Sequence, residues 1–265
     1  MSAIDNLFCQ LRAAGRKAFM PFVTAGDPAL EDLPAIVDAL QEGGADVIEL
    51  GIPFSDPIAD GPTIQAASVR ALERGVTPTA VLTALSRCEL RVPAVLMGYY
   101  NPVLRYGLSA FARAAREAGA AGTIISDLTP EESDEWVAAS RENSLATVFL
   151  AAPTSTDERL DAVAMRSTGF VYAVSRTGVT GAATTLSPDA VALVRRLRER
   201  TDSPICVGFG ISEPSHVREV CEVADGVIVG SRLVSLLDEE WNGGKGRESI
   251  VDWVRALKAA TARAD

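Results

Sequence analysis

One pattern recurs along the whole chain: a short, continuous run of apolar residues is followed by a longer stretch in which apolar residues have helical spacing. Within the runs, apolar residues do not alternate with polar ones, as is typical of strands that are buried on both faces. The units average about thirty residues, the size of a strand–helix crossover repeat. Eight such units, preceded by an amphipathic stretch at residues 4–14, predict a (β/α)8 TIM barrel with an extra N-terminal helix, formed by residues 1–265 as a single domain.

An open, doubly wound sheet is the alternative fold for such a pattern. Its first strand–helix turn carries a GxGxxG motif, and no such motif follows the first apolar run here. We therefore favour the barrel. Residues 99–107 are expected to form a loop, and a short helix is expected after Gly230. The strands of the barrel are expected at residues 18–24, 46–50, 94–98, 122–126, 146–151, 170–175, 205–207 and 227–229.

Composition excludes several classes of function. The formal net charge of −10 argues against a nucleic-acid surface, which needs a basic stripe. A single histidine, His216, cannot build a histidine-rich metal site, and no metal is expected. The charged residues at positions 1–17 predict that this segment is not a signal peptide, and no apolar run is long enough to span a membrane, so the expected location is cytoplasmic. Free thiols in a reducing compartment are expected for Cys9, Cys88, Cys206 and Cys221, none of which forms a CxxC pair.

Acidic residues gather where the second strand runs into a loop, in the segment DVIELGIPFSDPIADGP at residues 46–62. Active sites of such barrels lie at the carboxyl ends of the strands. If Glu49 points into the barrel mouth, partial desolvation raises its pKa toward the working range of a general acid–base; a Glu paired with a loop or an arginine is an equal alternative. For Asp60, local sequence alone favours an Asx turn or a helix cap.

Glycines gather after the last three expected strands. Glycine lets backbone N–H groups approach an anion closely, and a helix N-terminus adds its positive end. Loops that merely turn at glycine are the alternative. Because barrels of this type hold phosphate after the seventh and eighth strands, we predict a phosphate site. Its candidate residues are Gly178, Gly181, Gly208, Gly210, Gly230 and Ser231.

Motifs spread over the chain are PFVTAGDP (21–28), DVIELGIPFSDPIADGPTIQAA (46–67), MGYYNP (97–102), APTST (152–156), YAVSRTGVTG (172–181), VGFGIS (207–212) and VIVGS (227–231). Together, in this order, they resemble the tryptophan synthase α-subunit family. The block at residues 49–62 is the most specific of them. The segment DLTP at residues 127–130 and an apparent flexible insert at residues 242–246 depart from the family pattern outside these motifs.

The resemblance implies retro-aldol cleavage of indole-3-glycerol phosphate to indole and glyceraldehyde 3-phosphate. It assigns Glu49 as the general acid–base and Asp60 as the acceptor of the indole N–H. It also implies mobile loops at residues 51–61 and 176–187, with Thr180 contacting Asp60 when the second loop closes. The remaining implied substrate-binding residues are Phe22, Tyr99, Phe209 and, less specifically, Ile124 in an indole cleft, Tyr172 near the reacting centre, and Gly181, Phe209, Gly210, Gly230 and Ser231 at the phosphate.

The resemblance further implies a partner, a pyridoxal-phosphate β subunit that receives indole in an α2β2 heterotetramer, while the α subunit carries no cofactor. Three alternatives share parts of the pattern. A stand-alone lyase would release free indole. A catalytically idle barrel would bind the phosphate ligand and regulate a partner. A phosphoribosyl isomerase-type barrel would also hold phosphate, but the block at residues 46–67 does not fit it.

Overall fold

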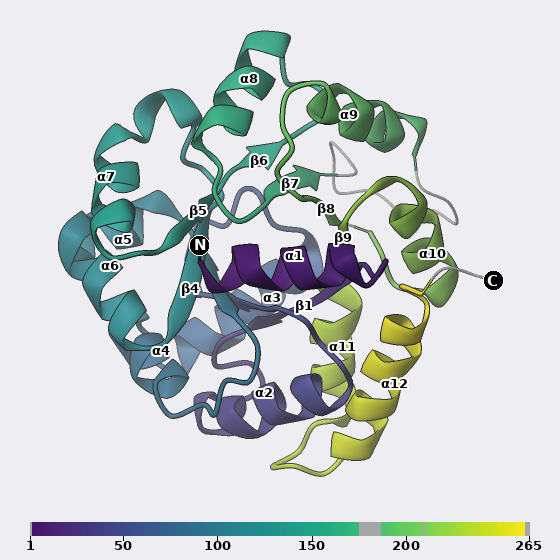
Figure 1. The fold of residues 1–265 in the computed structure, drawn as a ribbon. Coiled ribbons are helices and arrows are strands. Elements are labelled where there is room, and N and C mark those ends of the chain that lie inside the picture. The colour runs from purple at the N-terminus through teal and green to yellow at the C-terminus, as the bar shows by residue number, and fades with distance from the viewer. Residues whose placement is uncertain (1, 175–186, 209, 263–265) are drawn as a thin grey trace.

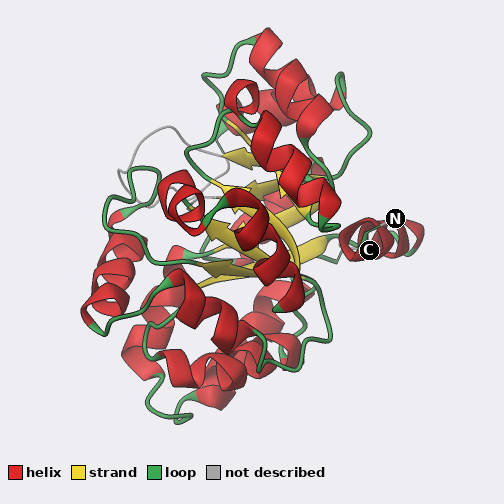
Figure 2. Ribbon diagram, turned by 90° about the vertical axis from the view of Figure 1, so that its left-hand side faces the viewer, coloured by secondary structure: helices red, strands yellow, loops and turns green. Residues whose placement is uncertain are grey.

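The computed structural model describes residues 2–174, 187–208 and 210–262. Its centre is a parallel sheet with the strand order β5-β4-β3-β2-β1-β9-β8-β7-β6. Helices surround this sheet as an outer ring (Figures 1 and 2). The predicted (β/α)8 barrel is confirmed. Its strands are β1 (Ala18–Thr24), β2 (Ile48–Gly51), β3 (Ala94–Gly98), β4 (Ala120–Ile125), β5 (Ala146–Val148), β6 (Leu150–Ala151), β7 (Val171–Val174), β8 (Ile205–Gly208) and β9 (Gly226–Val229).

Nine strands are observed in place of eight because the predicted fifth strand divides at Phe149. Before this residue the chain pairs with β4, and after it the chain pairs with β7. At the division, the Phe149 N–H donates to Ser167 Oγ at 3.3 Å, and its carbonyl accepts the Tyr172 N–H at 3.1 Å. Residues 146–151 therefore pair with β4 in their first half and with β7 in their second half, and this connection closes the barrel.

Helix α1 (Ala3–Ala13) crosses the end of the barrel at which the strands begin (Figure 1). It starts with a capping box, in which the Asp5 N–H donates to Ser2 Oγ at 3.1 Å and the Ser2 N–H donates to the Asp5 carboxylate at 2.8 Å. Its buried residues Ile4, Phe8 and Leu11 join the apolar interior of the barrel. Because α1 covers this end, the opposite end, where the strands finish, is left for the site.

The remaining helices follow the strands in the predicted alternation. None of the helices in the described part of the chain is long and apolar enough to span a membrane. They are α2 (Leu33–Glu42), α3 (Pro62–Glu73), α4 (Pro78–Leu85), α5 (Tyr100–Tyr106), α6 (Leu108–Glu117), α7 (Asp134–Glu142), α8 (Asp157–Arg166), α9 (Pro188–Arg198), α10 (Pro214–Val223), α11 (Ser231–Glu240) and α12 (Arg247–Ala259).

Residues 99–107 are not a loop, contrary to the prediction, because they contain the helix α5. The Asp127 carboxylate accepts the Tyr100 N–H at 2.7 Å, so the first turn of this helix is capped from the end of β4. The helix after Gly230 is also longer than expected, since α11 has 10 residues. The segment predicted as a flexible insert holds an antiparallel bridge between Asn242 and Lys245.

The second strand begins later than predicted, at Ile48 rather than Asp46. The carboxylate of Asp46 is used outside the strand, where it accepts the Phe19 N–H at 2.8 Å and pairs with the Lys258 ammonium group. It thereby ties the start of β2 to β1 and to α12. This register places Glu49 beside Phe22 on one side and Val95 on the other.

Candidate active site

Glu49 is the most unusual residue of the barrel interior. It lies on β2, its exposed fraction is 2%, and neither carboxyl oxygen has a hydrogen-bond partner among the described residues. Burial raises the pKa of Glu49 to about 8, and the nearby charge of Asp60 adds to this shift. No loop group or arginine among the described residues satisfies this carboxyl group. At neutral pH this carboxyl group holds a proton.

Asp60 lies on the loop that follows β2 and is 8% exposed. Its side chain does not cap α3, because the N-cap is Gly61 and no side-chain capping bond is formed there. The local interpretation as a helix cap is therefore wrong. Burial raises the pKa of Asp60 to about 6, while a hydrogen bond from the Tyr99 hydroxyl opposes this shift. Asp60 is thus mostly ionised at pH 7, where Glu49 is mostly protonated.

The position of the Asp60 loop is fixed from two sides. The Tyr99 hydroxyl accepts the Ala59 N–H at 3.0 Å and donates to the Asp60 carboxylate, so one group orients both backbone and side chain. From α3, the Gln65 amide donates to the carbonyl oxygens of Asp60 at 2.9 Å and of Pro57 at 3.4 Å. The sequence analysis missed Gln65. The available signal was its position as the fourth residue of the helix that follows the loop.

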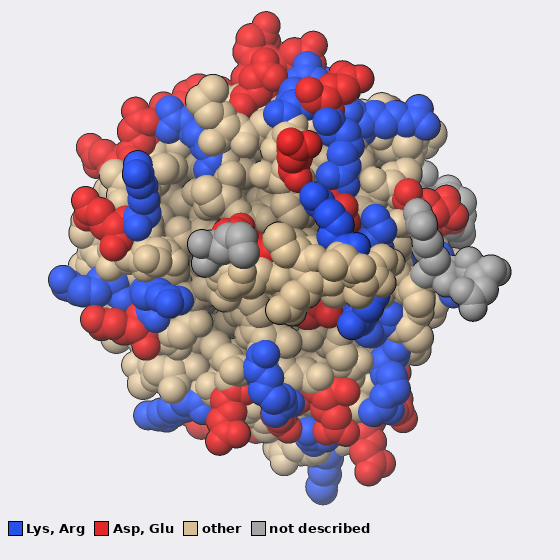
Figure 3. Space-filling model, in the orientation of Figure 1, with Lys and Arg blue, Asp and Glu red and all other residues tan. Residues whose placement is uncertain are grey.

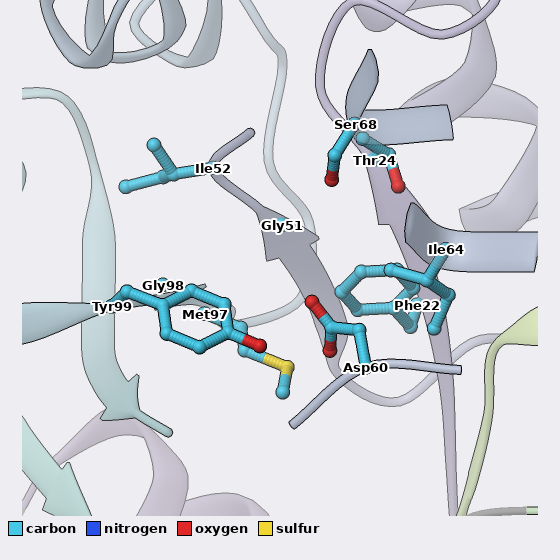
Figure 4. Close-up of a pocket in the computed structure, with 10 residues that line it drawn as sticks. All are labelled: Phe22, Thr24, Gly51, Ile52, Asp60, Ile64, Ser68, Met97, Gly98 and Tyr99. Atoms are coloured by element: carbon cyan, nitrogen blue, oxygen red, sulfur yellow. The ribbon is translucent and has the colours of Figure 1, made fainter. Parts of the chain in front are cut away.

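A small cavity opens beside Asp60 at the end of β1, β2 and β3. Its volume of about 10 Å³ is enough for one water molecule. Figure 4 shows the Asp60 carboxyl group between the Phe22 ring and the Tyr99 hydroxyl. The Thr24 hydroxyl has no partner among the described residues. A ligand of the size of indole therefore requires the lining side chains to move apart. They are Phe22, Thr24, Gly51, Ile52, Asp60, Ile64, Ser68, Met97, Gly98 and Tyr99.

Of the three predicted cleft residues with described positions, Phe22 and Tyr99 line this cavity. Tyr99 also stacks on Phe54, with ring centroids 5.0 Å apart. Ile124 is fully buried in the barrel interior but does not line the cavity. Sequence reasoning missed Ile64 and Ser68, although their i, i+4 spacing directly after the loop places them on one face of α3.

Tyr172 enters the barrel mouth from β7, opposite β2. A Cβ atom built on Gly208 would lie 2.3 Å from the Tyr172 hydroxyl oxygen, so this ring needs the glycine beside it on β8. Burial raises the pKa of Tyr172, and the charges of Glu49 and Asp60 raise it further. The predicted position of Tyr172 near both carboxyl groups agrees with this electrostatic coupling.

The predicted phosphate residues are only partly described. Gly230 is the N-cap of α11 and Ser231 its first residue; no side chain caps this end, which leaves its N–H groups for an anion. A Cβ atom on Gly230 would lie 3.3 Å from the Phe22 ring, which places this helix start next to the Asp60 cavity. Gly210 adopts a positive φ of 76°. Thr180, Gly181 and Phe209, the loop at 176–186 and Gly178 lie outside the described residues.

The arrangement is a pair of buried carboxyl groups at the mouth of a β/α barrel. Two carboxyl groups face one mouth, with environments that hold one protonated and the other ionised at neutral pH, and such a pair can donate and accept protons in one reaction. No cluster of metal-binding side chains occurs among residues 2–174, 187–208 and 210–262.

Comparison with known proteins gives the family. The family described as "Tryptophan synthase alpha chain" matches residues 8–262. A tryptophan synthase alpha chain of Burkholderia pseudomallei (strain 1106a) is 50% identical over 98% of this chain and 97% of its own length. That of Geotalea uraniireducens is 47% identical, with 98% and 97% covered. The chain belongs to the tryptophan synthase alpha chain family.

Solved structures agree with this assignment. A structure of Mycobacterium tuberculosis tryptophan synthase superposes with a TM-score of 0.92 at 41% identity and covers 99% of each chain. The tryptophan synthase subunit alpha of Legionella pneumophila str. Paris has a TM-score of 0.89 at 35% identity, with 98% of each chain covered.

Proposed function

We propose that this chain catalyses the retro-aldol cleavage of indole-3-glycerol phosphate to indole and glyceraldehyde 3-phosphate, as a carbon–carbon lyase. The observation that carries the proposal is the buried carboxyl group of Glu49, which has no hydrogen-bond partner among the described residues and a pKa raised to about 8, while the pKa of Asp60 is raised only to about 6. Cleavage of this substrate needs one proton delivered to indole C3 and one removed from the C3′ hydroxyl, which a single carboxyl group can do in turn.

The sequence of proton transfers follows from the two protonation states. Protonated Glu49 gives its proton to indole C3, and the ring becomes cationic. The Asp60 carboxylate accepts a hydrogen bond from the indole N–H and stabilises that charge. The Glu49 carboxylate then takes the proton of the C3′ hydroxyl while the C3–C3′ bond breaks. The electron pair of the broken C3–C3′ bond returns to the indole ring, and the aldehyde of glyceraldehyde 3-phosphate forms.

The remaining predicted residues hold the substrate in this proposal. Phe22 and Tyr99 pack against the indole ring. Tyr172 lies on the other side of the barrel mouth, near the reacting centre. Gly210, Gly230 and Ser231 bind the phosphate, together with Gly181 and Phe209, and Thr180 meets Asp60 when residues 176–187 close. The N–H groups at the start of α11 support this assignment.

We further propose a pyridoxal-phosphate β subunit as partner, in an α2β2 assembly that passes indole between subunits. Two large apolar side chains next to the site support the proposed contact with the β subunit. Ile58, on the Asp60 loop, is 83% exposed, and Leu104, on α5, is 50% exposed. The hydrogen bond from the Ala59 N–H to Tyr99 joins the loop to the residue that precedes α5. We place the protein in the cytoplasm, as one domain spanning residues 1–265.

An assay of the purified chain with indole-3-glycerol phosphate tests the lyase function. Indole and glyceraldehyde 3-phosphate should appear in equal amounts. A chain that binds the substrate without forming indole would be the regulatory barrel instead. Adding the β subunit should raise the rate of indole formation; an unchanged rate would favour a stand-alone lyase.

A further inference from the structure

A second cavity, with a volume of about 150 Å³, lies at the opposite end of the barrel from the carboxyl groups. It is bounded by the end of α1, the segment that leads into β1 and the residue before β9, all of which lie where strands begin. Figure 3 shows Lys and Arg side chains above and below the right-hand end of the region that α1 occupies in Figure 1, with Asp and Glu side chains among them. The cavity is lined by Phe8, Leu11, Arg12, Gly15, Arg16, Lys17 and Asp225.

The N–H donors of the three cationic side chains at this cavity are only partly used in hydrogen bonds and ion pairs. Arg12 donates to the Asp202 carbonyl oxygen at 3.3 Å and has no carboxylate partner within the described residues. The Arg16 guanidinium group lies 3.8 Å from Asp46, and its side chain is 57% exposed. Lys17 donates to a backbone carbonyl oxygen at 2.6 Å and is 3.9 Å from Asp225. Each therefore retains donors for a ligand.

The acidic groups at the cavity are already neutralised from elsewhere. Asp225 pairs with Arg198, and it accepts the Ile205 N–H at 2.9 Å. Asp46 pairs with Lys258 and accepts a backbone N–H from β1. The positive charge of the three lining cations is consequently not balanced, on a protein whose formal net charge is −10.

Compensation of the α1 dipole explains only part of this cluster. Arg12 is in the last turn of α1, where a cation interacts favourably with the helix C-terminus. Arg16 and Lys17 lie beyond the helix, and a dipole effect gives no reason for a cavity between the side chains. Two guanidinium forks and an ammonium group around a hollow fit the several oxygens of a phosphate group.

We propose that this cavity binds a small phosphate-bearing anion, such as pyrophosphate or a phosphate ester, at a site separate from the predicted active site. The arginines bind phosphate oxygens through paired N–H donors, and Lys17 adds a point charge. Since both arginines are exposed to solvent, binding should weaken as ionic strength rises.

Titration of the full chain with sodium pyrophosphate tests the proposal. Backbone amide resonances of Gly15 and Asp225 should shift in two-dimensional NMR spectra, with saturation. The double variant R12Q/R16Q should raise the dissociation constant read from these shifts by at least about tenfold, the effect of losing one charge-assisted hydrogen bond. Chloride at the same ionic strength should not reproduce the shifts.

The control is R87Q/R113Q, which removes two exposed arginines remote from the cavity and should leave the dissociation constant unchanged. Pyrophosphate bound only at the predicted active site would shift Gly230 and Ser231 but neither Gly15 nor Asp225, and that result would overturn the proposal. Equal dissociation constants in wild type and R12Q/R16Q would overturn it as well.

Discussion

Replacing Glu49 by Gln should change how the stability of the protein depends on pH. The folded protein raises the pKa of Glu49 from 4.5 to about 8, so folding favours its protonated form. In the wild type, ionisation of the unfolded chain lowers the free energy of unfolding as the pH rises from 4.5 to 8. A shift of this size corresponds to about 5 kcal/mol at most, at about 1.4 kcal/mol per pH unit.

Gln cannot ionise, so the free energy of unfolding of the E49Q variant lacks this dependence on pH. The stability of E49Q relative to wild type should therefore increase with pH between pH 5 and 8 and level off above about pH 8. Urea unfolding at half-unit pH steps, followed by circular dichroism, measures the difference. The exposed substitution E117Q is the control and should give a flat difference. A flat difference for E49Q would refute the argument that burial keeps Glu49 protonated.

Three further substitutions test other parts of the structure. D46A leaves a strand N–H and an ammonium group without their partner, and urea unfolding should show a loss of about 3–5 kcal/mol. Y99F removes the hydrogen bond that lowers the pKa of Asp60, so the acidic limb of the profile of kcat/KM against pH should move up by about one unit. G208A puts a methyl group 2.3 Å from the Tyr172 hydroxyl oxygen and should lower kcat about tenfold by displacing that ring.

Each of these results has a clear contrary outcome. D252A, which breaks the exposed pair with Arg255, should cost less than about 1 kcal/mol, and an equal loss in D46A would contradict its structural role. If the acidic limb of the pH profile of Y99F coincides with that of wild type, Tyr99 does not control the pKa of Asp60. Wild-type kcat in G208A would show that the position of Tyr172 is unimportant.

The fold was largely predictable because its signals are local. The strand at residues 94–98 has the predicted bounds, since a continuous apolar run marks it. Helix α5 was missed because its capping group, Asp127, lies 27 residues away in the chain. The division of the fifth strand at Phe149 depends on barrel closure, which no local pattern reports.

The site was predictable to a lesser extent from the residues alone. The position of Glu49 at the end of an apolar strand indicated burial, but its lack of a hydrogen-bond partner in the described part of the chain is a property of the assembled barrel. For Asp60, local chemistry predicted an Asx turn or a helix cap, and the structure joins its side chain to Tyr99, 39 positions further along the chain. Only the family resemblance distinguished these two roles in advance.

Cleavage of indole-3-glycerol phosphate by E49Q tests the central claim, that Glu49 carries the protons of the reaction. With substrate at saturation, indole formation should fall by about 10²–10⁴-fold relative to wild type, the usual contribution of a general acid–base. The affinity for glyceraldehyde 3-phosphate should stay unchanged, because Glu49 is not among the residues assigned to the phosphate. Indole formation by E49Q at the wild-type rate would contradict the claim.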